Sequence, residues 1–175
     1  MWDVPQPAGI DGAGQRALNR ALVFALVRRR RTVSQSALAR ETGLSKATIS
    51  EIVAEFQQAG FLRPVGPGPS NGGRRPLLLT FEPQARLAIG VEIGEAEGRA
   101  ALVDLDATPL RVLHQPERAQ TPEAALALAA SLVETLLTEA PRDRLLGLGV
   151  GTPGLVDSQT GLIRLAPDLG WQEVP

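Results

Sequence analysis

Cysteine is absent from this 175-residue sequence, and histidine occurs once, as His114. Without cysteine the chain can form neither disulfides nor cysteine-ligated metal sites. One histidine gives no histidine-rich metal site and no obvious Ser-His-Asp arrangement. No run of about 18 apolar residues is present, so we expect no spanning helix and no membrane partner. The N-terminus also lacks the pattern of a secretory signal, which predicts a cytoplasmic protein.

The net charge of −1 conceals a basic first half and an acidic second half. Residues 1–86 carry 12 basic and 6 acidic side chains, whereas residues 87–175 carry 6 and 13. A DNA-binding module joined to a module of another kind would have this distribution. Chance segregation of surface charge would produce it as well, so charge needs the support of a motif.

Helical signals dominate the beginning of the chain. Residues 1–14 are rich in proline, glycine and alanine and are predicted to be a disordered tail. Apolar residues then recur at helical spacing from Leu18 to Leu26, which predicts a first helix that ends in a run of arginines. Ser34 and Ser45 are typical N-caps and predict a second and a third helix, the third ending near Gly60.

The segment from Gln35 to Ile52 has the spacing of a helix-turn-helix. Ala39 is small where the two helices approach each other, and Gly43 lies at the turn, where glycine adopts an unusual backbone conformation cheaply. The turn-rich residues 64–76, between a short apolar segment and a strand at residues 77–81, then predict a hairpin. Residues 15–82 are therefore predicted to form a winged helix-turn-helix domain. A purely structural three-helix bundle is the alternative.

Two surfaces of this domain are candidates for contact with DNA. Short polar side chains on the third helix suit the major groove, and Lys46 and Thr48 are favoured among them. Arginines in the glycine-flanked hairpin tip suit the minor groove, unless the tip is only a solvated loop. Arginines at the end of the first helix are expected to contact phosphates or to compensate the helix dipole. The full candidate set is Ser45, Lys46, Ala47, Thr48, Ser50, Arg74, Arg75, Arg30 and Arg31.

The second half of the chain has the pattern of an α/β domain. Residues 83–86 are predicted to be a linker, and residues 87–175 a separate domain with an unfinished sheet. Strands are expected at residues 87–93, 99–105, 110–113 and 145–150. A helix opens at Thr121 and Pro122, with its apolar face predicted at Leu126, Ala129, Ala130, Val133, Leu136 and Leu137. Trp171 is expected to be a packing residue.

The motifs together resemble the ROK family of repressors, open reading frames and sugar kinases. They are Ser-Gln-Ser-Ala-Leu-Ala-Arg-Glu-Thr-Gly-Leu-Ser-Lys-Ala-Thr-Ile-Ser at 34–50, Gly-Gly-Arg-Arg-Pro at 72–76, Ala-Ile-Gly-Val-Glu-Ile-Gly at 88–94, Gly-Leu-Gly-Val-Gly-Thr-Pro-Gly-Leu-Val-Asp at 147–157 and Ala-Pro-Asp-Leu-Gly-Trp at 166–171. The resemblance runs from about Arg16 to the end. It points to the regulator branch, because the family's kinases lack the N-terminal winged helix.

The resemblance implies a sugar-responsive transcription factor, usually a repressor of carbohydrate genes. Its second domain would be an incomplete actin-like (ribonuclease H-like) sugar-kinase lobe, which makes the fold α/β overall. The family's sugar cleft places candidate effector contacts at Gly151, Thr152, Pro153 and Gly154. The implied partners are double-stranded DNA and a sugar or sugar phosphate, with a homo-oligomer where the effector domain is complete.

One departure from the family argues against an enzyme. The kinases open this domain with an Asp-x-Gly-x-Thr phosphate loop, where this chain has Glu92 and Ala96 as the first and last residues. Ala96 lacks the hydroxyl, and Glu95 and Glu97 would repel a nucleotide phosphate. The family's catalytic aspartate and zinc cluster lie farther along than the chain reaches, so no catalytic residue, metal or cofactor is expected. A sugar kinase of the family and a truncated remnant of a regulator are the alternatives.

Overall fold

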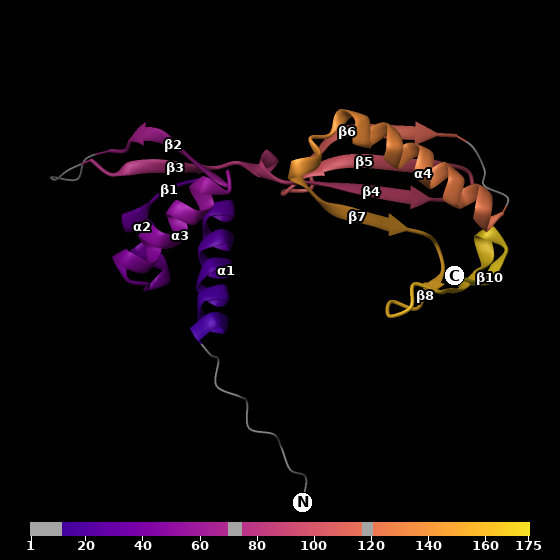
Figure 1. The fold of residues 1–175 in the computed structure, drawn as a ribbon, viewed down its shortest axis with the longest axis horizontal. Coiled ribbons are helices and arrows are strands. Elements are labelled where there is room, and N and C mark those ends of the chain that lie inside the picture. Colours follow the sequence, from indigo (N-terminus) through magenta and orange to yellow (C-terminus); the bar gives the residue numbers. More distant parts are fainter. Residues whose placement is uncertain (1–11, 70–74, 117–120) are drawn as a thin grey trace, which may run out of the picture. The chain divides into compact units, whose positions relative to one another are not determined.

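The computed structural model describes residues 12–69, 75–116 and 121–175 (Figure 1). The chain separates into two compact units, Met1–Glu82 and Pro83–Pro175. The tail was expected to extend to residue 14, but the first helix already begins at Gly12. Each residue added to an existing helix gains a hydrogen bond, so the helix extends upstream of its apolar stripe despite two glycines. Residues 1–11 lie outside the described part.

The helices of the first unit are α1 (Gly12–Arg30), α2 (Gln35–Thr42) and α3 (Lys46–Gln58). Both expected N-caps are confirmed. The hydroxyl of Ser34 accepts a hydrogen bond from the backbone N–H of Ala37, and that of Ser45 accepts one from Thr48. Gly43 ends α2 in the left-handed region with φ of 72°, which a residue with a Cβ adopts only with strain. The turn between α2 and α3 is therefore fixed by its own sequence.

Three short strands complete this unit in the order β1-β3-β2 (Figure 1). They are β1 (Thr32–Ser34), β2 (Leu62–Pro67) and β3 (Leu77–Phe81), all antiparallel. The pattern did not predict β1, because three residues are too few for a period-two signal. The expected strand at residues 61–62 extends to Pro67, since prolines are tolerated in an edge strand. Three helices with a β-hairpin of this kind make a winged helix-turn-helix.

All four phenylalanines of the chain lie together in the first unit, where Phe56 and Phe81 are buried and Phe24 and Phe61 are half-buried. The ring of Phe24 meets the rings of Phe56, Phe61 and Phe81 edge to face, with centroids 5.8, 5.4 and 5.6 Å apart. Such pairs contribute about 0.5–1.5 kcal/mol each beyond the burial of their area. This cluster joins α1, α3 and the hairpin of β2 and β3, called the wing below, and so it fixes α3 against the wing.

A four-stranded sheet in the order β6-β5-β4-β7 forms the centre of the second unit. The strands are β4 (Leu87–Ile93), β5 (Gly98–Asp104), β6 (Pro109–Gln115) and β7 (Leu145–Gly151). Neighbours are antiparallel except β4 and β7, which are parallel. A crossover through α4 (Pro122–Glu139) and a 3-10 turn, η2 (Arg142–Arg144), leads from β6 to β7. The α/β domain predicted from the sequence is confirmed.

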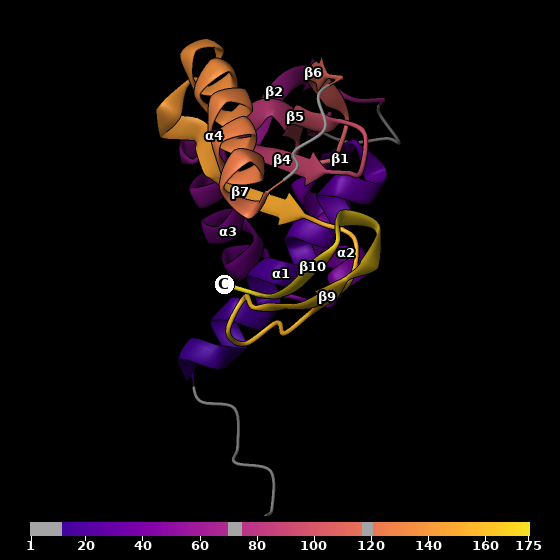
Figure 2. The same cartoon turned by 90° about the vertical axis from the view of Figure 1, so that its right-hand side faces the viewer.

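A smaller sheet in the order β10-β9-β8 follows (Figure 2). It comprises β8 (Leu155–Val156), β9 (Ile163–Ala166) and β10 (Trp171–Val174), with a 3-10 turn, η3 (Pro167–Leu169), before the last strand. Another 3-10 turn, η1 (Pro83–Ala85), occupies the expected linker at 83–86. The carbonyl of Pro83 accepts a hydrogen bond from Leu105 N–H at 3.1 Å, so this segment belongs to the second unit. A single 3-10 turn has no periodic signature that would have predicted it.

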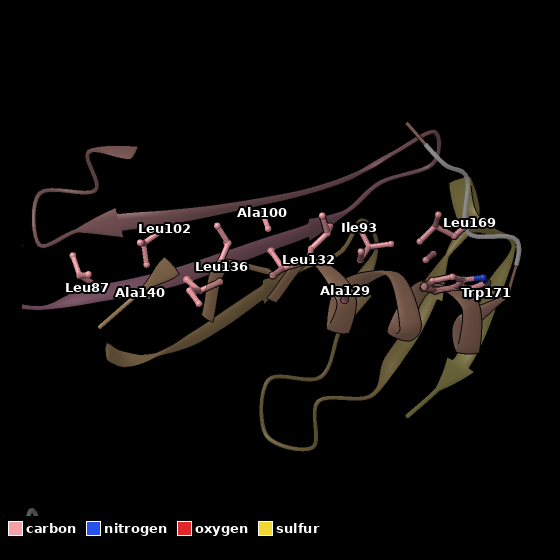
Figure 3. Packing of buried hydrophobic residues seen from close by; sticks show 14 residues of the cluster. Leu87, Ile93, Ala100, Leu102, Ala129, Leu132, Leu136, Ala140, Leu169 and Trp171 are labelled. Atoms are coloured by element: carbon pink, nitrogen blue, oxygen red, sulfur yellow. The ribbon is translucent and has the colours of Figure 1, made fainter. Parts of the chain in front are cut away.

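The core of the second unit lies between α4 and the sheet, with Leu132 and Leu136 in the middle of the row and Trp171 at one end (Figure 3). Trp171 is 7% exposed, as expected of a packing residue. The expected helix face is partly wrong, because Leu126 is 72% exposed and Ala130 is exposed too. Apolar side chains surround most of α4, so periodicity could not select the buried stripe. In the described part of the chain, no helix is both long enough and apolar enough to cross a membrane.

Candidate nucleic-acid interface

The first turns of α3 present a polar surface opposite a buried one. Lys46, Ala47 and Ser50 are exposed, whereas Ile49 is fully buried. Ile52, Val53 and Phe56 continue the buried stripe. The N-terminal end of the helix is thereby held outward, with small side chains around one lysine. Small side chains around a lysine are a helix surface of the kind that fits the major groove.

Ser45 and Thr48 have a local role that limits their freedom. Their hydroxyls lie 2.9 Å apart, and the Ser45 hydroxyl also accepts from the Thr48 N–H at 3.1 Å. The two side chains therefore cap α3 together. Thr48 was favoured as a DNA contact on sequence grounds, and its half-buried hydroxyl is engaged in the cap. Lys46, with its exposed ammonium group, is the stronger candidate for a base or phosphate.

The base of the wing is closed by a hydrogen bond from Gly68 N–H to the carbonyl of Pro76, at 2.8 Å. Arg75 is exposed beside this closure. Arg74, the other arginine expected at the tip, lies outside the described residues. The charge of Arg75 is therefore presented to solvent at the base of the wing.

Arg30 and Arg31 make structural contacts that the sequence did not predict. Arg30 forms an ion pair with Glu41 of α2, with Nη2 at 2.9 Å from Oε2. Arg31 has a left-handed backbone with φ of 64°. Its guanidinium carbon lies 5.8 Å from the centre of the Phe81 ring, and its carbonyl accepts from Phe81 N–H. Both arginines thus anchor the end of α1, and phosphate contact by either remains a prediction.

Three of the four expected effector residues line a hollow in the second unit. The hollow has a volume of about 440 Å³ and is lined by Glu92, Gly94, Glu95, Gly151, Thr152, Pro153 and Asp168. Three carboxylates and no basic side chain face it. The hydroxyl of Thr152 is buried and has no hydrogen-bond partner in the described part of the chain. Such a lining suits hydroxyl groups and disfavours phosphate.

Gly154, the fourth expected effector residue, lies against the backbone of β9 and is not among the residues that line the hollow. A Cβ at this position would overlap the carbonyl oxygen of Leu165 and lie 2.8 Å from the Cα of Ala166. Its φ is 113°, a region that essentially only glycine occupies. Close packing of two backbones therefore explains this glycine without a ligand.

Glu97, expected together with Glu95 to repel a nucleotide phosphate, is not among the residues that line the hollow. The Glu97 carboxylate forms ion pairs with Arg99 and His114 instead. Its hydrogen bond to His114 is the main reason that the pKa of Glu97 is lowered, and the charge of Arg99 lowers it further. His114 thus contacts the Glu97 carboxylate through its Nε2 on the surface of the sheet.

Asp157 closes the turn between β8 and β9. Its Oδ1 accepts from the N–H of Gln159 at 3.0 Å and of Thr160 at 3.3 Å, and Arg164 lies 3.5 Å from Oδ2. These bonds, the one from Gln159 first, lower the pKa of Asp157. Because the folded-state pKa is below the unfolded one, the ionised carboxylate stabilises the turn above the unfolded pKa. That contribution disappears as the pH falls through the folded-state pKa.

We therefore expect the Asp157 carboxyl to titrate below the usual aspartate value of about 3.9. A carbon-detected NMR titration of the side-chain carboxyl measures this midpoint directly. Arg164→Gln should raise the midpoint only slightly, since the backbone bonds remain. A midpoint at or above about 3.9 in the unsubstituted protein would contradict the prediction.

Comparison with known proteins agrees with a winged-helix domain followed by a sugar-kinase-like unit. Residues 16–75 match the MarR family, and residues 88–175, half of the chain, match the ROK family. The chain belongs to the ROK family. The resemblance inferred from the motifs is thereby confirmed.

Curated relatives of the chain include transcriptional regulators. It is 29% identical over 163 residues to the xylose repressor of Caldicellulosiruptor bescii, covering 91% of this chain and 41% of the relative. It is 31% identical over 157 residues to the DNA-binding transcriptional dual regulator NagC of Escherichia coli, covering 88% and 38%. The chain thus spans about two fifths of the length of the relatives it matches.

A solved structure shows the same fold. The crystal structure of a ROK family transcriptional regulator, a homologue of the E. coli MLC protein, superposes with a TM-score of 0.67 at 18% identity. The match covers 91% of this chain and 41% of the other. The expected fold class, a winged helix-turn-helix followed by part of a ROK domain, is confirmed.

Proposed function

We propose that this chain binds double-stranded DNA sequence-specifically and acts as a sugar-responsive transcriptional repressor. The observation that carries the proposal is α3, whose exposed Lys46, Ala47 and Ser50 lie opposite the buried Ile49. The excess of basic side chains in residues 1–86 supports it, since DNA binding draws on phosphate contacts. The relatives named xylose repressor and NagC support the same class of function. We also propose that the protein works in the cytoplasm, where the DNA lies in bacteria such as those of the named relatives.

Two elements of the first unit are proposed to contact DNA. α3 enters the major groove, where Lys46 meets a guanine edge or a phosphate. The wing, with Arg75 at its base and Arg74 just before it in the sequence, follows the adjacent minor groove. Paired half-sites on DNA call for a dimer, and we propose that a complete effector domain supplies the dimer contacts. This chain alone then binds DNA more weakly than a complete homologue.

The hollow beside Gly151, Thr152 and Pro153 is the proposed effector site. Its carboxylates from Glu92, Glu95 and Asp168 can accept hydrogen bonds from hydroxyls. The unpartnered hydroxyl of Thr152 adds a donor or acceptor. We propose a neutral sugar as the effector ahead of a sugar phosphate, because three carboxylates would repel a phosphate. The same acidity argues against nucleotide binding and therefore against kinase activity.

Selection from a pool of random DNA duplexes is the test. The unsubstituted chain should enrich a defined motif, and Lys46→Ala and Arg75→Ala should each weaken binding to it. A lost base contact costs about 1–3 kcal/mol, roughly 5- to 150-fold in affinity. A lost phosphate contact lowers the slope of log affinity against log salt by about 0.9. Arg111→Ala, which removes an exposed arginine of the second unit, is the matched control.

Two outcomes would contradict the proposal. One is binding that enriches no motif and depends only on salt. The other is equal weakening by Lys46→Ala and by the Arg111→Ala control. A sugar-phosphorylation assay addresses the alternative function, because turnover at the rate of a kinase would show that the chain is an enzyme.

A further inference from the structure

One acidic side chain holds two of the four consecutive arginines at the end of α1. Arg30 donates two hydrogen bonds to Oε2 of Glu41, from Nε at 3.1 Å and from Nη2 at 2.9 Å. Nη2 of Arg29 lies 4.0 Å from the same oxygen. The Glu41 side chain is 25% exposed, compared with 72% for Arg29 and 53% for Arg30. Glu41 is therefore the more enclosed partner and remains within reach of solvent ions.

The same ion pair borders a polar hollow at the base of the wing, with a volume of about 510 Å³. Its charged lining residues are Arg30, Arg40 and Glu41, and Pro69 and Pro76 contribute from the two arms of the hairpin. The guanidinium groups of Arg30 and Arg40, beside the wing, form a surface suited to the phosphodiester backbone of a duplex. Glu41 is the one acidic group among the lining residues, so its charge opposes the attraction of Arg30 and Arg40 for phosphate.

We propose that Glu41 is a positioning residue that competes with DNA phosphates for Arg30 and Arg29, and so limits the sequence-independent part of DNA binding. The inference rests on the proposed function of the first unit. Phosphate contacts add affinity without reading sequence. Glu41 must release its arginine before that arginine can bind a phosphate, and its own charge repels phosphate. It therefore lowers the affinity contributed by phosphate contacts equally on every duplex.

Glu41→Gln tests the proposal, because it removes the charge and keeps the size of the side chain. We expect the affinity for a random duplex at about 0.1 M salt to rise roughly three- to tenfold, with the salt slope steeper by about one unit. The affinity for a selected motif should rise by the same factor. Arg30→Gln should weaken binding, since it leaves Glu41 with only the more distant Arg29 as a partner, and the double variant should return close to the unsubstituted chain.

Glu55→Gln is the matched control, because it also removes one carboxylate from an exposed ion pair with an arginine of α1. Glu55 pairs with Arg20 at 2.5 Å. It lies nine residues after Lys46 on α3, roughly 13 Å along the helix axis. The distance between Glu55 and Lys46 exceeds the screening length of about 10 Å at 0.1 M salt, so the charge of Glu55 is largely screened at the end of α3 proposed to bind DNA. Glu55→Gln should therefore change the salt slope much less than Glu41→Gln.

Elution from heparin, a polyanion without bases, separates the inference from the proposed function. Glu41→Gln should elute at higher salt than Glu55→Gln. If the chain binds no duplex while this difference persists, the proposed function fails and the role of Glu41 toward polyanions stands. If Glu41→Gln matches Glu55→Gln on both duplex and heparin, the inference is overturned. Glu41→Ala is the second variant, and thermal melting verifies that each variant is folded.

Discussion

Phe56→Ala is expected to bring the first unit close to its unfolding midpoint near physiological temperature and to weaken DNA binding strongly. Truncating a buried phenylalanine costs about 3–5 kcal/mol, and a unit of this size has a stability near the lower end of about 5–15 kcal/mol. Phe56 is 4% exposed and meets Phe24 and Phe61 edge to face at 5.8 and 5.9 Å. Truncation of Phe56 removes the ring contact between α3 and Phe24 of α1. Thermal unfolding followed by circular dichroism, together with duplex binding, measures the effect.

Two controls define this result. Phe56→Leu keeps most of the volume and should cost less than half as much, with binding retained. Leu22→Ala truncates a side chain on α1 that is 48% exposed, and it should lower stability by about 1 kcal/mol or less. A loss below about 1 kcal/mol for Phe56→Ala would show that the aromatic cluster does not hold the unit together.

The parts of the first unit that were predictable are those specified by neighbouring residues. A serine cap and its recipient N–H are three residues apart, as with Ser34 and Ala37. Gly43 marks a backbone conformation that its own residue type permits. The helix-turn-helix follows from such local signals, and so its elements were predicted within a few residues of their bounds.

What the sequence did not reveal depends on contacts between distant segments. Glu41 and Arg30 are eleven residues apart on two different helices, and no periodic rule links them. β1 exists because Thr32–Ser34 pairs with β3, more than forty residues away. A basic cluster followed by an acid on the next helix was the available signal for the ion pair. That pattern is too common to identify a pair before the helix packing is known.

The expected effector segment, residues 151–154, has two different roles, and here too a contact with a later segment of the chain explains the difference. Residues 151–153 comprise the last residue of the parallel strand β7 and the two residues after it, and they line the hollow, as expected where a ligand binds at the carboxyl end of a strand. Gly154 instead packs on β9, with which β8 pairs. The motif Gly-Thr-Pro-Gly therefore combines a candidate binding surface with a structural requirement. Substitutions at its two ends should have different consequences.

Gly154→Ala is accordingly expected to disrupt the hairpin of β8 and β9. The new Cβ would overlap the Leu165 carbonyl oxygen and press on Ala166, and the backbone at φ of 113° is itself unfavourable for alanine. Backbone strain of about 1–3 kcal/mol and overpacking of about 1–3 kcal/mol both act at this position. Because the obstruction is backbone, it cannot be relieved by rotation of a side chain. Hydrogen exchange should then become much faster at the amides of residues 155–166.

Gly161→Ala is the matched control for this prediction. Gly161 lies in the same hairpin with φ of 77°, and a Cβ there would meet nothing within 4 Å. It should therefore cost only the backbone strain of about 1 kcal/mol and leave the hairpin paired. If the two substitutions accelerate exchange equally, then backbone strain alone explains Gly154. A larger effect at Gly154 would instead establish the close packing of its backbone on β9 as the reason for this glycine.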